Sequence, residues 1–251
     1  MQIRMMPILV LALCAATTEA QTNRDTSWHY LLEPYILFPN MQGQTGIGSL
    51  PPVDVDEDPG DIFENLQFGA MLYAEAHNDR WAFTSDVLYM KLEADVLQDS
   101  SIADGKAELS QLGWELAFLA RLSPWMEIGV GAIYMKIDAE LDLTLNTPLG
   151  AIGRTADLDK DWVDPTVLVR ATVPLGDKWF LVGRANIGGF GVSSDSVWQL
   201  QGDVGYRFSD RMLMTVGYRA LGYDYDRGSG TERFVYDMTT FGPMLRLGFT
   251  F

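Results

Sequence analysis

Two histidines, His29 and His77, are the residues of this chain best suited to acid–base chemistry. Each lies a few positions from a glutamate, Glu33 or Glu75, and an imidazole beside a carboxylate is a common arrangement for moving protons. Hydrolysis through such a pair also needs an activated nucleophile. Ser85, the obvious serine in the middle of an alternating segment, falls on its apolar face. We therefore expect the histidines to belong to a hydrogen-bond network, and we predict no catalysis.

Other motifs that carry chemistry are missing from the sequence. It contains no zinc-ligand spacing, no phosphate-binding glycine loop and no dinucleotide fingerprint. The formal net charge of -16 also disfavours binding to nucleic acid, whose phosphates attract basic surfaces. We therefore expect no cofactor, no bound metal and no nucleic-acid partner.

A set of charged residues recurs on the polar faces of the apolar segments. It contains seven acids and six arginines, which nearly cancel, and no lysine. The planar guanidinium group of arginine can bind a carboxylate through two hydrogen bonds, which suits ion pairs in a confined space. Unpaired charges there would lose hydration without compensation, so we expect a paired network. The set is Glu33, Glu75, Asp86, Glu115, Arg121, Glu127, Asp164, Arg170, Arg184, Asp203, Arg207, Arg219 and Arg246.

The segments that carry these charges alternate apolar and polar residues with a period of two, as β-strands do. In QLGWELAFLARL, residues 111–122, Trp114 and Leu116 fall on one face and Glu115 on the other. We predict ten strands, with eight or twelve as alternatives. Their approximate ranges are 28–46, 65–77, 80–95, 107–122, 125–144, 160–174, 178–191, 196–208, 211–224 and 233–251.

The predicted connections alternate between short and long. Tight turns such as ND, SP, LGD and SD alternate with longer links such as residues 50–65 and 146–159. This asymmetry is typical of an antiparallel up-and-down transmembrane β-barrel, which has short periplasmic turns and long external loops. The predicted fold class is therefore all-β, with residues 21–251 forming one barrel. An even number of strands would place both ends of the chain on the periplasmic side.

Residues 1–20 have the features of a secretory signal peptide. A basic residue, Arg4, precedes the apolar run MPILVLALCAA, and small residues ending at Ala20 suit cleavage. The apolar run is too short to cross a bilayer as a helix. Cys14, the only cysteine, lies inside this segment, so the mature chain would have no thiol. A lipoprotein signal is the alternative, although Leu13 stands where such signals have a small residue.

Tryptophans stand at the beginnings of four predicted strands, beside the short turns, where an amphipathic ring would meet lipid headgroups. Tyr89, Tyr134 and Tyr218 lie further along three strands, about one membrane crossing away. We interpret the two sets as interface belts, with packing inside a soluble sandwich as the alternative. The four tryptophans are Trp28, Trp81, Trp125 and Trp179.

The chain ends in LRLGFTF, a strand whose apolar face carries Leu245, Leu247, Phe249 and Phe251. With the signal segment and the ten alternating segments, this ending resembles the small outer-membrane β-barrel proteins of Gram-negative bacteria. That group includes the OmpA membrane domain and OmpW-like proteins. The resemblance implies that the last strand is a sorting signal read by the barrel-assembly machinery. It also implies that outer-membrane lipid and lipopolysaccharide surround the protein; we expect a monomer.

The same alternation would fit a soluble barrel with an apolar interior, such as a lipocalin. A face exposed to water would carry many lysines and glutamates, whereas the polar face here is mostly glycine, threonine, glutamine and alanine. We therefore expect the apolar face to meet lipid and the charge network to fill a narrow lumen. The main prediction is a plugged barrel with a structural or surface-exposed role. The alternatives are a narrow pore for small solutes and a soluble periplasmic binding protein.

The remaining negative charge is expected in the long loops. Acid runs of this kind bind calcium in some proteins, but Pro59 interrupts this run and its spacing departs from the known calcium loop. Solvated acidic loops are therefore the expectation. The acids are Asp54, Asp56, Glu57, Asp58, Asp61 and Glu64 in the first loop, Asp99 and Asp104 in the second, and Asp157, Asp159 and Asp161 in or beside the third.

Overall fold

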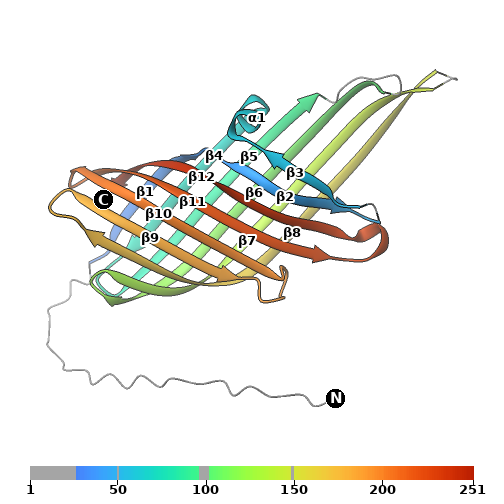
Figure 1. Cartoon of the computed structure of the whole chain (residues 1–251). Helices are drawn as coiled ribbons and strands as arrows, with labels where there is room; N and C mark the ends of the chain where they lie inside the picture. Colours follow the sequence, from blue (N-terminus) through green and yellow to red (C-terminus); the bar gives the residue numbers. More distant parts are fainter. Residues whose placement is uncertain (1–26, 50, 96–101, 148–149) are drawn as a thin grey trace, which may run out of the picture.

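The computed structural model describes residues 27–49, 51–95, 102–147 and 150–251, which form a closed antiparallel β-barrel (Figure 1). The predicted signal peptide, with Cys14, lies outside these residues. The strands are β1 (His29–Leu37), β2 (Asn40–Ile47), β3 (Val53–Glu57), β4 (Leu66–His77), β5 (Trp81–Asp95), β6 (Ile102–Ser123), β7 (Met126–Thr147), β8 (Gly150–Pro174), β9 (Trp179–Gly188), β10 (Ser196–Ser209), β11 (Met212–Arg227) and β12 (Phe234–Thr250). Two short helices, α1 (Pro59–Glu64) and the 3-10 turn η1 (Gly230–Glu232), complete the described elements.

Ten strands, β1 and β4 to β12, form the wall, and β12 pairs with β1 to close it. The predicted all-β class and the count of ten are therefore confirmed. β2 and β3 are additional. β2 continues β1 along β12 in one register, from Leu31 opposite Thr250 to Ile47 opposite Phe234. Only residues 38–39 separate the two strands, because Pro39 has no N–H to donate to the sheet.

Residues 50–65, predicted to be a loop, contain a strand and a helix. β3 pairs with β2, and the side chains of Asp54 and Asp56 accept hydrogen bonds from β2 glutamines. The carboxylate of Asp58 caps α1 by accepting from the backbone N–H groups of Gly60 and Asp61, at 2.6 and 3.1 Å. None of the described helices is long and apolar enough to cross a membrane.

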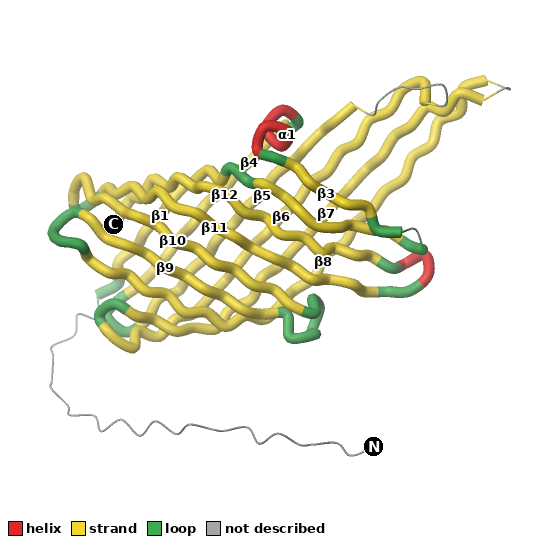
Figure 2. Tube along the Cα trace, in the orientation of Figure 1, coloured by secondary structure: helices red, strands yellow, loops and turns green. Residues whose placement is uncertain are grey.

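The strands β6, β7 and β8 are much longer than a membrane crossing requires. They have 22, 22 and 25 residues, whereas β9 has 10. Figure 2 shows their far ends standing out beyond the barrel as a narrow sheet, here called the blade: residues 102–110, 138–147 and 150–161. The prediction of a loop over 146–159 was wrong, because most of this segment pairs with β7.

The blade changes the positions of several predicted loop acids. Asp157, Asp159 and Asp161 lie on β8, opposite β7, and Asp104 lies on β6. Asp99 lies outside the described residues. Within the described chain β8 pairs with β9 only from Thr166 to Pro174, and residues 163–165 are hydrogen-bonded to the loop after β9, so residues 150–162 of β8 form an open sheet edge.

Side chains alternate between the lumen and the outside along the wall. Trp114 and Leu116 are 41% and 47% exposed, whereas Glu115 between them is 4% exposed. On β12, Leu245 is exposed and the adjacent Arg246 is buried. The apolar face therefore points outward, which is the reverse of a lipocalin-like barrel and does not favour that alternative.

Pro34 of β1 and Pro165 of β8 are two of the prolines within the wall, where a bulge is the usual position for this residue. Neither marks a register shift. The β1–β12 ladder skips Glu33 and Pro34 and then resumes in the same register. The carbonyl of Pro165 accepts from the N–H of Gly189, so its missing N–H faces β9 at the point where that ladder ends.

Candidate functional site in the lumen

The lumen has two ends that differ in structure. The short turns, residues 78–80, 124–125, 175–178 and 210–211, lie at one end together with Phe251, whose N–H donates to the carbonyl of Tyr30. We call it the turn end. The blade lies at the other end, which we call the blade end (Figure 1).

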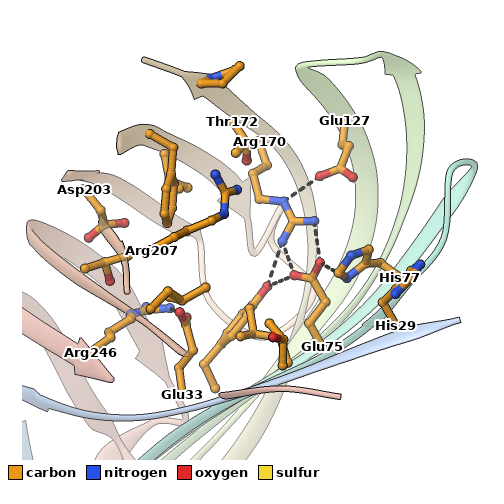
Figure 3. Close-up of a pocket in the computed structure, with 18 of the residues that line it drawn as sticks. His29, Glu33, Glu75, His77, Glu127, Arg170, Thr172, Asp203, Arg207 and Arg246 are labelled. Atoms are coloured by element: carbon orange, nitrogen blue, oxygen red, sulfur yellow. Dashed lines mark hydrogen bonds and ion pairs between the residues drawn. The ribbon is translucent and has the colours of Figure 1, made fainter. Parts of the chain in front are cut away.

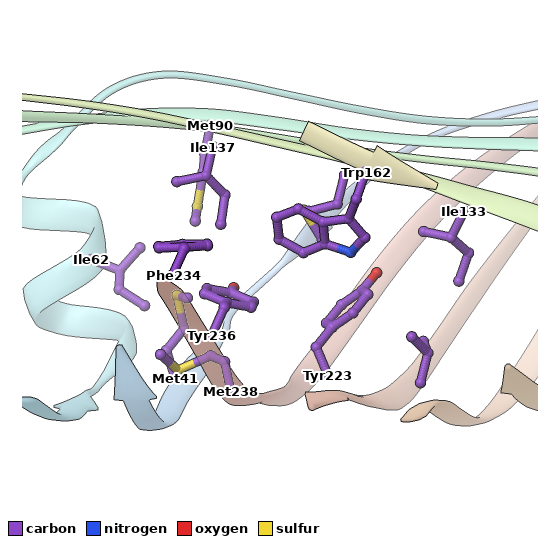
Figure 4. Packing of buried hydrophobic residues seen from close by; sticks show 12 residues of the cluster. Met41, Ile62, Met90, Ile133, Ile137, Trp162, Tyr223, Phe234, Tyr236 and Met238 are labelled. Carbon is purple, nitrogen blue, oxygen red and sulfur yellow. The ribbon is translucent and has the colours of Figure 1, made fainter. Parts of the chain in front are cut away.

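An apolar cluster fills the lumen toward the blade end (Figure 4). Trp162 of β8 lies at its centre, with its ring stacked on Tyr225 at 4.3 Å between centroids and 6.3 Å from Phe234. Ile62 of α1 packs into the same cluster, so the helix covers part of the opening. The buried members are Met41, Ile62, Met90, Ile133, Met135, Ile137, Trp162, Val197, Tyr223, Phe234, Tyr236 and Met238.

Sequence reasoning missed this cluster, although a signal for it was present. Trp162 lies two positions from Asp164, and Tyr223 lies four from Arg219, so each shares the strand face of a predicted lumen charge. The alternation that places the charges in the lumen places these aromatic residues there as well.

Buried ion pairs form the next layer. The carboxylate of Asp86 accepts from the hydroxyl of Tyr35 at 2.6 Å and from Nη1 of Arg219 at 3.1 Å. Arg219 also donates to Oε1 of Gln199 at 2.8 Å. On the adjacent strand β6, Glu115 lies opposite Asp86 in the ladder, and its Oε1 is 2.8 Å from Nη2 of Arg184.

A second group of charges lies closer to the turn end (Figure 3). Arg170 bridges two carboxylates: its guanidinium pairs with Glu75, and its Nε lies 2.6 Å from Oε2 of Glu127. Arg121 pairs with the other oxygen of Glu127 at 3.0 Å. The hydroxyl of Tyr73 accepts from Arg170 and donates to Glu75. Separately, Glu33 and Arg246 pair at 3.4 Å.

Three of the thirteen predicted residues depart from the expected pairing with an oppositely charged side chain. Asp164 is buried, but it accepts from the backbone N–H and hydroxyl of Ser194, at 2.7 and 2.5 Å, and so anchors the 189–195 loop. Asp203 accepts from Gln201 at 2.6 Å. Arg207 is exposed, and its guanidinium carbon lies 4.4 Å from the ring centre of Phe180. It faces the open turn end, where water can hydrate it.

A cavity of about 1170 Å³ opens at the turn end and extends inward to Arg184 and Arg246. We call it the vestibule. Farther in, between Asp86 and Tyr223, a second cavity has a volume of only about 50 Å³. The vestibule therefore ends against the ion-pair layer.

The two histidines lie at the rim of the vestibule. His29 of β1 is opposite His77 of β4, with ring centroids 5.7 Å apart, and Nδ1 of His77 lies 3.0 Å from Glu75. Ser85 is on the outer surface, where its hydroxyl accepts from the indole N–H of Trp114 at 3.0 Å. Within the described residues, no three His, Cys, Asp or Glu side chains are grouped to hold a metal ion.

The residues predicted to meet lipid lie on the outer surface. The four tryptophans, Trp28, Trp81, Trp125 and Trp179, are exposed beside the turn end. At the other predicted belt Tyr218 is exposed, whereas Tyr89 and Tyr134 are half-buried. Of the predicted assembly signal, Leu245, Phe249 and Phe251 are exposed and Leu247 is half-buried. Their roles in membrane anchoring and assembly stay predictions.

Comparison with known proteins gives a structural likeness only. No protein-family model and no curated protein matches the sequence. The chain superposes on the crystal structure of the outer membrane protease OmpT from Escherichia coli with a TM-score of 0.52 at 9% identity, over 94% of this chain and 100% of that one. The fold is that of an outer-membrane β-barrel.

Two further solved barrels superpose less well. Ail, the attachment invasion locus protein of Yersinia pestis, gives a TM-score of 0.38 at 7% identity, over 89% of this chain and 98% of that one. A Pseudomonas aeruginosa FadL homologue gives 0.35 at 11% identity, over 89% and 90%. At these identities the likeness concerns the fold and transfers no activity. The narrower resemblance to the OmpA and OmpW-like group stays a prediction.

Proposed function

We propose that this protein is an integral outer-membrane barrel that neither conducts solutes nor catalyses a reaction, and that it presents the blade outside the cell. The observation that carries this proposal is the filled lumen. An apolar layer centred on Trp162 and a layer of buried ion pairs lie one behind the other across the axis.

The two layers oppose conduction for different reasons. An ion entering the apolar layer would lose hydration without gaining a polar partner. In the layer behind it, the arginines and carboxylates already neutralise one another, so a passing ion would have to displace a buried partner. The alternative of a narrow pore requires a continuous polar path through both layers.

The blade is suited to an aqueous location. On its outward face Lys106 lies between two glutamates, with Nζ 2.9 Å from Glu93 and 3.1 Å from Glu108. Acids also face each other across strands: Asp138 is opposite Asp159, with Nζ of Lys136 at 3.0 and 3.7 Å from the two carboxylates, and Glu140 is opposite Asp157. Like charges in these positions require water or counterions. We therefore place the blade beyond the lipid and the short turns in the periplasm.

Conductance in planar bilayers tests this function. We expect the purified barrel to give no ion current above background, because both layers block the axis. A double variant, Trp162→Ala with Phe234→Ala, is the control: it thins the apolar layer and should raise the leak current. Steady single-channel steps from the unmodified barrel would refute the proposal, whatever the variant does.

A further inference from the structure

The vestibule contains a cationic group that the ion-pair network does not use. Most arginines that line it, including Arg121, Arg170, Arg184 and Arg246, pair with carboxylates. Arg207 makes no ion pair within the described part of the chain; its guanidinium lies over the ring of Phe180. A ring held against the guanidinium plane fixes its position while leaving its N–H groups available.

The position of Arg207 directs those N–H groups into the cavity. Figure 3 shows its side chain reaching into the vestibule on the side of Arg170 and Thr172. No interaction with a carboxylate is drawn at its head group. A fixed guanidinium in a partly enclosed space is a strong binding site for a carboxylate or phosphate, to which it can donate two hydrogen bonds.

A second unused polar group lies in the same wall. Thr215 of β11 is 5% exposed and lines the vestibule, and its hydroxyl has no hydrogen-bond partner among the described residues. Buried hydroxyls are usually paired, so an unpaired one at a cavity indicates a place for water or for a polar ligand atom. The carbonyl oxygen or hydroxyl of a ligand would satisfy it.

Part of the wall beside Arg207 is apolar. Phe180 and Leu213 are buried and line the cavity, and Leu213 is opposite Arg207 in the β10–β11 pair. The cavity, about 1170 Å³, exceeds the space needed by a single small ion. We propose that the vestibule binds organic oxyanions from the periplasmic side, with the carboxylate or phosphate on Arg207 and an apolar part against Phe180 and Leu213.

Titration calorimetry of the detergent-purified full-length barrel tests this site. Phenyl phosphate and benzoate are the probes, because they share one apolar body and differ in the oxyanion. We expect saturable binding of at least one of them, weakened about tenfold or more in Arg207→Gln, since the charged fork is lost. Tighter binding of phenyl phosphate would indicate a phosphate ligand, and tighter binding of benzoate a carboxylate ligand.

The matched control is Arg211→Gln, which removes an arginine that lines the vestibule and makes no ion pair among the described residues. We expect it to change the affinity less than about twofold. Arg207→Lys keeps the positive charge but loses the planar guanidinium that can donate two hydrogen bonds. The affinity of this variant should therefore fall between those of the unmodified protein and Arg207→Gln. Equal weakening by the Arg207→Gln and Arg211→Gln variants would reduce the effect to general charge attraction and overturn the proposal. Absence of binding to both probes at millimolar concentration in a folded, heat-modifiable barrel would overturn it as well.

Discussion

Arg170 and Glu127 are direct cross-strand partners on β8 and β7, with Nε of the arginine 2.6 Å from Oε2 of the glutamate. The same guanidinium pairs with Glu75 on β4. One side chain thus ties the β7–β8 pair to a strand on the other side of the vestibule. Through Arg170, the lumen charges connect β4 with β7 and β8, which are not its neighbours in the order of the strands.

Replacing Arg170 with methionine should destabilise the barrel by about 3–5 kcal/mol, because the buried carboxylate of Glu75 would be left without its arginine partner. Urea unfolding in lipid vesicles measures this loss. The double variant Arg170→Met with Glu75→Gln should recover part of it, since the uncompensated charge is removed. Equal stability of the single variant and the unmodified protein would show that the bridge is not needed.

Proline substitutions test the open edge of β8. The Pro165 carbonyl faces β9, so by alternation the backbone N–H of Asp159 faces the open edge and that of Lys160 faces β7. Asp159→Pro should therefore be tolerated, whereas Lys160→Pro removes a ladder hydrogen bond and should destabilise the blade. Limited proteolysis of the folded barrel compares the two. If Asp159→Pro makes the blade as sensitive to the protease as Lys160→Pro does, the edge of β8 is not open.

Cysteine labelling tests the orientation of the barrel, because Cys14 is the only cysteine and lies in the predicted signal segment. Thr155→Cys places a thiol on the blade, and Asp177→Cys places one in a short turn. We expect a membrane-impermeant maleimide to label the first on intact cells and the second only after the outer membrane is opened. The reverse pattern would invert the proposed topology.

The β11–β12 hairpin should respond to acid. Arg233 donates to both carboxylate oxygens of Asp226 at 2.9 and 2.6 Å, and these hydrogen bonds lower the pKa of Asp226 below its ordinary value. A lowered pKa in the folded state means that the pair stabilises the hairpin above the ordinary aspartate pKa. That stabilisation is lost as the pH falls through the lowered pKa.

An NMR titration of the Asp226 carboxyl should therefore give a midpoint below about 3.9. Arg233→Gln should return the midpoint toward that value, because the charged donor is gone. A midpoint that is the same in both forms would show that Arg233 does not hold the carboxylate in solution.

The sequence was enough to establish the fold class and the direction of each strand face. Period-two alternation assigns neighbouring residues to opposite faces, so Trp114 and Glu115 had to point in opposite directions wherever the strand was placed. The shortage of lysine on the polar face then favoured the lumen for Glu115, which is 4% exposed. These conclusions depend only on local order along the chain.

The tertiary structure alone decided what depends on pairing between distant segments. Residues 150–159 look like part of a loop by composition and form a strand because β7 lies beside them. Asp164 meets Ser194 instead of an arginine because β9 ends early and its loop folds back over β8. Among the described residues Arg207 meets no carboxylate, because its place at the open end puts it beside Phe180. Registers and strand ends depend on contacts between residues far apart in sequence, which the alternation pattern does not specify.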